Sequence, residues 1–219
     1  MKYELTDETK QYAGRTLHRI RRLSDGELGG WVESQYNLSQ KGSCWVDDEA
    51  MVYGEAMVSG KAQVFGEARV CDGARVCDGA WVFGGAWVFG RACVSGDAHV
   101  YGKAHVSGKS CVYGEAWAYG GAWVWGEAWV YGKARVSGRA RVSGRACVQF
   151  ETGESPLFLS DLRWPVTFGS GVIQIGCEFH PVSAWEGFSD DEIASMDEYA
   201  LEFWREHRDI IIDVSKRLT

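Results

Sequence analysis

Residues 80–91 read AWVFGGAWVFGR, which is two successive copies of the six-residue pattern Ala-x-Val-x-Gly-x. The pattern continues in both directions and extends from residue 44 to residue 148. Val fills 17 of its 18 Val positions, with Ala118 as the exception, and Ala fills 16 of its 18 Ala positions. Because self-similarity at a fixed period is the signature of repeat architectures, this pattern predicts a solenoid.

The three repeated positions have separate physical meanings. Ala and Val lie two residues apart, so on an extended strand their side chains share one face, which suits a narrow apolar core. The Gly position, from 48 to 144, holds only Gly or Asp, and Asp occurs at 48, 72 and 78. This restriction predicts a positive φ, which Gly adopts freely and Asp tolerates better than most residues. A turn every six residues leaves short strands, which can bury a core only by stacking on copies of themselves.

An aliphatic residue followed four positions later by a small one, as in Val52 and Ala56 or Val88 and Ala92, resembles the hexapeptide-repeat proteins of the single-stranded left-handed β-helix class. The resemblance implies three hexads per triangular coil, so the 18 hexads would form about six coils. We therefore predict a mainly β protein, a left-handed parallel β-helix with an N-terminal β cap and a small C-terminal α+β domain. A right-handed β-helix ranks below this prediction because its coils are usually longer and less regular.

The chain as a whole is similar to a group of phage and prophage hexapeptide-repeat proteins. The similarity is carried by residues 3–10 and 14–17, by the glycine turn at residues 28–31, and by residues 173–178. It implies a virus-encoded protein that acts in the cytoplasm of a bacterial host, and it supplies fold and context rather than chemistry.

Residues 1–43 are predicted to form an N-terminal cap and an irregular first coil. Residues 1–29 read as a strand pair that includes residues 16–23 and a turn at residues 24–26. Residues 30–38 keep the repeat period but slip by two residues before Val46. A cap is expected because the open end of a solenoid exposes unpaired strand edges.

Residues 151–219 are predicted to form a separate domain after the β-helix of residues 44–150. We expect a linker over 151–165, a hairpin within 164–176, and one helix that begins at a capping box of Ser189 and Glu192. Apolar residues then recur at helical spacing: Ile193, Met196, Ala200, Phe203 and Trp204. This domain holds 14 acidic and 5 basic residues, a net charge of −9, whereas residues 1–150 carry +2.

The composition excludes several classes of protein. The net charge of the 219-residue chain is −7, which argues against a general nucleic-acid binder because such proteins are usually strongly basic. No apolar run approaches the ~20 residues of a membrane span, and the charged N-terminus does not resemble a signal peptide. Seven cysteines without a secretion signal fit reduced thiols. Together these features predict a cytoplasmic protein that does not enter a membrane.

Tryptophans recur at outward positions of the middle coils. Three hexads per coil would stack every third hexad in columns and display these rings on more than one face. A large exposed apolar patch usually marks an interaction surface, so we predict a homodimer or homotrimer. The alternative is that the rings stack on one another and only stiffen the sheets. The predicted interface consists of Trp81, Trp87, Trp117, Trp123 and Trp125.

The hexapeptide-repeat resemblance suggests one enzyme activity, acyl transfer from a CoA-linked donor. His99 and His105 are the two histidines within the repeat and would supply the general base. They lie six residues apart, on adjacent faces, and no inserted loop interrupts the hexads. We therefore keep acyl transfer as the alternative and predict no catalytic residue.

One end of the solenoid is basic, with aromatic residues among the cations. Such a cluster predicts a site for an anionic small molecule such as a nucleotide, or a dock for the acidic C-terminal domain. The cluster comprises Trp129, Tyr131, Lys133, Arg135, Arg139, Arg141 and Arg145.

The cysteines do not predict a metal site. Cys93 and Cys111 should lie one coil apart, but zinc needs four ligands, typically from two close pairs, and no second pair accompanies them. We predict neither a metal nor a cofactor. The combined prediction is a non-catalytic scaffold of phage origin that sequesters or blocks a host protein, such as a defence protein, or a small nucleotide.

Overall fold

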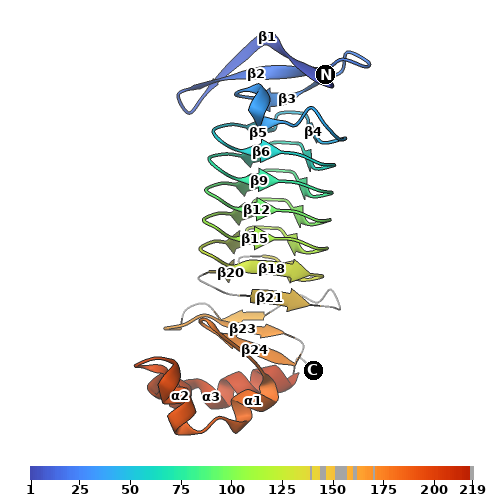
Figure 1. The fold of residues 1–219 in the computed structure, drawn as a ribbon. Coiled ribbons are helices and arrows are strands. Elements are labelled where there is room, and N and C mark those ends of the chain that lie inside the picture. Colours follow the sequence, from blue (N-terminus) through green and yellow to red (C-terminus); the bar gives the residue numbers. More distant parts are fainter. Residues whose placement is uncertain (139, 144–146, 151–156, 160–161, 170, 218–219) are drawn as a thin grey trace.

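The computed structural model describes residues 1–138, 140–143, 147–150, 157–159, 162–169 and 171–217. The repeat forms a parallel β-solenoid of about six coils, which confirms the mainly β fold predicted from the hexads. An antiparallel hairpin covers the end nearer the N-terminus, and a small domain of strands and helices follows the other end (Figure 1).

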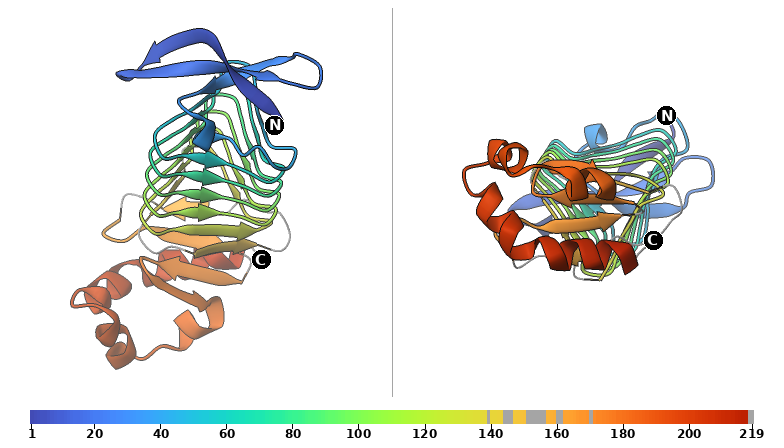
Figure 2. Two further views of the ribbon diagram at one scale, coloured as in Figure 1. Left: turned by 45° about the horizontal axis from the view of Figure 1, so that its top comes forward. Right: turned by 90° about the horizontal axis from the view of Figure 1, so that it is seen from below.

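Each coil contributes one short strand to each of three faces, and the coils superpose when the solenoid is viewed from its end (Figure 2). Each strand pairs in parallel with the strands three hexads before and after it, so that Trp81 lies between Gln63 and His99. Backbone hydrogen bonds join successive coils, for example from Trp81 N to Ala98 O at 2.9 Å. The predicted columns, built from every third hexad, are therefore confirmed.

The strands sort into three named faces. Face 1 consists of β4 (Trp45–Val46), β7 (Gln63–Val64), β10 (Trp81–Val82), β13 (His99–Val100), β16 (Trp117–Ala118) and β19 (Arg135–Val136). Face 2 consists of β5 (Met51–Val52), β8 (Arg69–Val70), β11 (Trp87–Val88), β14 (His105–Val106), β17 (Trp123–Val124) and β20 (Arg141–Val142). Face 3 consists of β6 (Met57–Val58), β9 (Arg75–Val76), β12 (Cys93–Val94), β15 (Cys111–Val112), β18 (Trp129–Gly132) and β21 (Cys147–Phe150).

The core is a narrow prism filled by the side chains at the Ala and Val positions of the hexads. The Val side chains from residue 46 to residue 142 are at most 2% exposed. Cys44 and Ser110, which replace Ala, are fully buried as well. The Ser110 hydroxyl donates a hydrogen bond to Ser107 O at 2.7 Å, so this buried polar group is satisfied. Small inward side chains therefore set the close approach of the three faces.

Every described residue at the Gly position of the hexads has a positive φ, from 51° at Asp48 to 74° at Gly126. The predicted backbone constraint is confirmed, including its three Asp members. The turns are also crowded, since a Cβ added at Gly90 would lie 3.0 Å from the backbone nitrogen of Gly108. Asp is tolerated because its carboxylate bonds the next coil: Asp72 Oδ2 accepts a hydrogen bond from Gly90 N at 3.2 Å.

The N-terminal cap is an antiparallel sheet that continues face 2. Its strands β1 (Tyr3–Tyr12), β2 (Arg15–Arg22) and β3 (Leu28–Val32) are followed by the 3-10 turn η1 (Gln35–Asn37). The first coil is irregular as predicted, because Val32 pairs with Val52 and the chain between them is longer than three hexads. Tyr3 and Ile20 join the solenoid core, and burial raises the pKa of Tyr3 to about 12. The cap thus closes the end of the prism with apolar side chains.

The C-terminal domain packs a four-stranded antiparallel sheet and, in its described part, three helices around its own core. Its elements are β22 (Leu157–Leu159), β23 (Val166–Gly169), β24 (Val172–Ile175), β25 (Glu178–Pro181), α1 (Val182–Gly187), α2 (Asp190–Met196) and α3 (Ala200–Arg217). The predicted hairpin corresponds to β23 and β24. Among the described residues, no helix is long and apolar enough to cross a membrane.

Two predictions for this domain are wrong in part. The expected linker over 151–165 contains β22, and the expected single helix is divided into α2 and α3. Ser189 and Glu192 do form the capping box that begins α2. Asp197 ends that helix with an extended backbone, and its carboxylate accepts a hydrogen bond from Tyr199 N at 3.0 Å. This side-chain bond to the backbone competes with a continuous helix.

Replacing Gly90 tests whether the turn is a backbone constraint. Gly90→Val should lower the free energy of unfolding by on the order of 1–3 kcal/mol, because a β-branched residue is strained at positive φ. Gly90→Asp should cost less, because its carboxylate can reach Gly108 N as Asp72 reaches Gly90 N. Urea denaturation measures both changes.

Gly85→Lys is the matched control, because Gly85 lies outside the positive-φ region. The same position of other hexads already holds Lys61 and Arg91. Gly85→Lys should leave the stability nearly unchanged. Equal losses for Gly90→Val and Gly90→Asp would show that the column is not a backbone constraint.

Candidate binding surfaces

An aromatic column runs along one edge of face 1. Phe65, Phe83, Tyr101 and Tyr119 stack with ring centroids 4.8 to 5.0 Å apart and ring planes within 4° of parallel. This spacing matches the distance between neighbouring strands, so the strand register itself aligns the rings. The faces of each inner ring are turned towards its neighbours in the column, which leaves ring edges for an outside molecule.

A second row on face 1 alternates tryptophan and histidine. His99 lies between Trp81 and Trp117, with ring centroids 5.6 and 5.2 Å away. Trp81 remains 44% exposed. The Arg135 guanidinium lies 4.9 Å from the ring centroid of Trp117, which is a cation–π contact. The two rows together form the face-1 aromatic surface, which consists of Phe65, Trp81, Phe83, His99, Tyr101, Trp117 and Tyr119.

Face 2 carries a second set of aromatic residues. The cap hairpin covers the part of this face that lies nearest the N-terminal end of the solenoid. Tyr12 and Leu17 of the cap hairpin pack with Met51, Tyr53 and Cys71, each of which is at most 6% exposed. Two apolar side chains of the hairpin therefore cover the beginning of this column. Beyond the hairpin the column continues as Trp87, Phe89, His105, Trp123 and Trp125.

The structure divides the predicted interface between two faces. Trp81 and Trp117 lie on face 1, whereas Trp87, Trp123 and Trp125 lie on face 2. Neighbouring faces of a triangular prism turn away from each other, so one flat partner contacts one set only. The rings do stack along the columns, yet Trp81 and Trp123 stay almost half exposed. Oligomerisation through these residues stays a prediction.

His99 and His105 occupy different faces and do not form a pair. The Nδ1 atom of His99 lies 3.0 Å from Asp97 O. With Nδ1 as the donor, Nε2 is left as the acceptor, which is the tautomer that a general base needs. However, tryptophans lie on both sides of the ring, and no carboxylate contacts either imidazole among the described residues. The imidazole of His99 is thus oriented by a backbone carbonyl, and among those residues neither histidine has a carboxylate partner to stabilise its protonated form.

The predicted anion site is spread around the solenoid rather than gathered in one place. Arg135 lies on face 1, Arg141 on face 2 and Trp129 on face 3, because consecutive hexads turn onto consecutive faces. Lys133 and both arginines are exposed. Within the described ranges, no ion pair joins these three cations to the C-terminal domain.

The predicted anion site has three further residues, Tyr131, Arg139 and Arg145. Tyr131 stacks on Tyr113 at a centroid distance of 5.1 Å, so it belongs to a ring column on face 3. Arg139 and Arg145 lie outside the described residues. Both the anion site and the docking alternative stay predictions.

The predicted proximity of two cysteines is confirmed. Cys93 and Cys111 pair on neighbouring strands, and Cys77 lies beside Cys93. Burial, with further contributions from Asp78 and Cys93, raises the pKa of the Cys77 thiol to about 12. The Cys77 thiol is therefore protonated near neutral pH in the metal-free protein. In the part of the chain that the structure describes, no group of three or more ligating side chains is placed to hold a metal ion.

Two cavities stand out in the described part of the chain, one at the N-terminal end of the solenoid and one in the C-terminal domain. One, of about 560 Å³, adjoins Lys2, Arg22 and Trp45 at the N-terminal end. Its cations are engaged, since Lys2 Nζ donates to Cys44 O and Arg22 pairs with acidic residues of the adjoining turn. The other, of about 90 Å³, lies among aromatic side chains of the C-terminal domain. Sequence analysis missed the second cavity because its walls come from separate strands and helices.

Comparison with known proteins leaves the function to the geometry. No protein-family model matches the chain, and no curated protein matches it either. The surfaces described above are therefore the basis for a functional proposal.

The stack of His105 on Trp123 leads to a prediction about pH. The two ring centroids lie 4.6 Å apart with planes 9° from parallel, and burial lowers the pKa of His105 from its ordinary value of 6.5. The unfolded chain then binds a proton more readily than the folded one, so neutral His105 contributes stability above pH 6.5 that is lost as the pH falls. Thermal unfolding of His105→Gln should therefore show a smaller loss of stability than the wild type between neutral and mildly acidic pH.

The comparison isolates His105 because the two proteins share every other titrating group. Identical pH dependence of the melting temperature in both proteins would contradict the prediction.

Proposed function

We propose that the protein is a non-catalytic scaffold that binds another protein through the face-1 aromatic surface. The observation that carries this proposal is a continuous double row of partly exposed aromatic rings on a hydrogen-bonded sheet. Contiguous exposed surfaces of this kind mark interaction sites. Aromatic residues are also the side chains most enriched at protein interfaces.

The ring geometry favours a protein over a nucleotide. Bases bind proteins by stacking on free ring faces, but the rings of the face-1 column are already stacked on one another. Ring edges instead make edge-to-face contacts with other aromatic side chains. The cap hairpin provides an example within the chain, since Tyr12 meets Tyr53 at 5.6 Å and 64°.

The solenoid also presents this surface at low entropic cost. The strands of β10, β13 and β16 are each paired with a strand on both sides, and their rings are held against neighbouring rings. Ordering of side chains is one of the costs that binding must overcome. A surface ordered before binding avoids much of that cost.

The similarity to phage and prophage hexapeptide-repeat proteins supports a host protein as the target. In this proposal the scaffold sequesters or blocks that protein in the bacterial cytoplasm. A second copy of the chain fits the same surface, in keeping with the expected homodimer or homotrimer. Both occupants are proteins, and their contacts with the ring edges would be of the same kind.

Mutation of face 1 tests self-association directly. The double variant Trp81→Glu with Trp117→Glu places two carboxylates in the face-1 aromatic surface, where an apolar partner would leave them unsolvated. Light scattering should report a dimer or trimer for the wild type and a monomer for the variant.

The matched control is Met57→Glu with Arg75→Glu, which adds two carboxylates to exposed positions of face 3. It should leave the assembly intact. A monodisperse wild-type monomer at micromolar concentration would contradict self-association, and equal dissociation by both double variants would contradict the assignment to face 1.

A second experiment tests the absence of turnover. Because no orienting carboxylate contacts His99 or His105 among the described residues, we expect neither imidazole to act as a general base, and His99→Gln with His105→Gln is the variant for comparison. Incubation of the wild type with acetyl-coenzyme A and a mixture of amine and hydroxyl acceptors, which would take up the acetyl group, should release no free thiol. Thiol release that disappears in the double variant would establish the acyltransferase alternative and overturn the proposal.

A further inference from the structure

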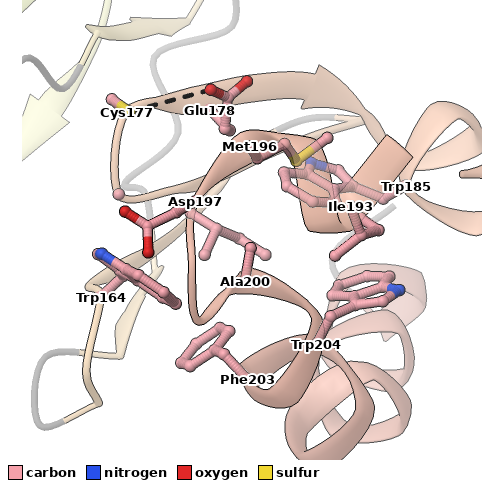
Figure 3. Close-up of a pocket in the computed structure, with 12 residues that line it drawn as sticks. Trp164, Cys177, Glu178, Trp185, Ile193, Met196, Asp197, Ala200, Phe203 and Trp204 are labelled. Carbon is pink, nitrogen blue, oxygen red and sulfur yellow. Dashed lines mark hydrogen bonds between the residues drawn. The ribbon is translucent and has the colours of Figure 1, made fainter. Parts of the chain in front are cut away.

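The cavity of about 90 Å³ in the C-terminal domain is walled by aromatic rings. Figure 3 shows Trp164 and Phe203 on one side of it and Trp185 and Trp204 on the other. Trp164 and Phe203 meet edge to face at 5.1 Å, and Trp185 and Trp204 lie 5.1 Å apart at 37°. The rings therefore surround the space from several directions instead of filling it.

Two of these walls are held in place by specific contacts. The indole nitrogen of Trp185 donates a hydrogen bond to Ile173 O at 2.9 Å. Trp164 lies against Gly176, where an added Cβ would come within 3.1 Å of its ring. Gly176 also has a φ of +58°, so this position suits glycine on two grounds. The cavity is thus bounded by ordered side chains.

The charged groups at the cavity are acidic. Glu178 and Asp197 are among the described residues that line it, and that set contains no Lys, Arg or His. The Glu178 carboxylate already has a partner, since its Oε2 atom lies 3.0 Å from His180 Nε2, so Asp197 is the acidic group left for a ligand. Asp197 is exposed, and one of its carboxylate oxygens bonds Tyr199 N. The surrounding domain carries a net charge of −9, which adds a negative potential. The cavity therefore favours a cation.

Cations already bind the outer sides of two wall residues. The Arg163 guanidinium lies 5.4 Å from the Trp164 ring, and that of Arg208 lies 6.0 Å from the Trp204 ring. Neither arginine is among the residues that line the cavity. The same indoles thus meet cations outside the cavity and have none inside it.

The size of the cavity limits what it can hold. A cavity of about 150 Å³ accepts benzene, so about 90 Å³ corresponds to about four non-hydrogen atoms. A nitrogen with three methyl groups has this size, and its charge is spread over a surface that aromatic faces attract.

We propose that this cavity is a cation site that takes an alkylammonium group. The methyl or methylene groups contact Trp164, Phe203 and Trp204, and the positive charge lies near Asp197. The site belongs to a different domain from the face-1 aromatic surface and does not depend on the function proposed for that surface.

Titration of the full-length protein with choline tests the proposal, followed by nuclear magnetic resonance of the tryptophan indole groups. The signals of Trp164 and Trp204 should shift in a saturable way. The neutral carbon analogue of choline, 3,3-dimethyl-1-butanol, should bind at least about tenfold more weakly because it lacks the charge. Equal binding of the two probes, or no shift with choline, would overturn the proposal.

Two variants and a control locate the binding. Asp197→Asn keeps an oxygen that can accept the Tyr199 N–H bond, and it should weaken choline binding several-fold without unfolding α3. Trp164→Leu should abolish the binding. Trp81→Leu on face 1 should leave it unchanged, so failure of this site and failure of the face-1 proposal give different results. Unchanged choline affinity in Asp197→Asn and Trp164→Leu would overturn the assignment.

The ammonium group can come from a small molecule or from a lysine side chain of a protein. Titration with N-acetyl-lysine methylamide and with its trimethylated form distinguishes these sources. Binding of both amides would support a lysine side chain, binding of the trimethylated form alone would support a methylated lysine, and binding of choline alone would support a free ammonium compound.

Discussion

The positive-φ turn at every sixth residue is the constraint on which the rest of the structure depends. It redirects the chain after each short strand, so that three hexads close a coil and every third hexad comes into register. A Cβ at this turn approaches the backbone of the next coil, as the 3.0 Å distance at Gly90 shows. The position therefore accepts Gly, or an Asp whose carboxylate bonds the next coil, as at Asp48, Asp72 and Asp78.

Register then decides what the outside of the solenoid can do. Identical side-chain types in every third hexad become a continuous column, and strand spacing places aromatic rings of that column in contact. The same rule separates residues that are close in sequence, such as His99 and His105, or Arg135 and Arg141. A solenoid of this kind builds extended surfaces of one chemistry more readily than a pocket where different groups converge.

The C-terminal domain is built from segments that do not repeat. Its sheet and helices bring Trp164, Trp185 and Trp204 together around one cavity, although these residues are far apart in sequence and belong to different segments. Aromatic and acidic side chains from separate segments line that cavity together. The chain thus combines a repetitive aromatic surface with a small, non-repetitive cavity.

The sequence by itself determined the coils, the Ala and Val core, the outward columns and the positive φ of the Gly column. It could do so because each hexad contacts the third hexad before and after it, so a period in sequence specifies a contact in space. It also determined the capping box of Ser189 and Glu192, which is a local interaction. Only the tertiary structure decided how the rings of face 1 are oriented, that Met51 and Tyr53 lie under the cap hairpin, and which residues wall the C-terminal cavity. These features depend on contacts between segments with no constant separation, and no sequence period can report such contacts.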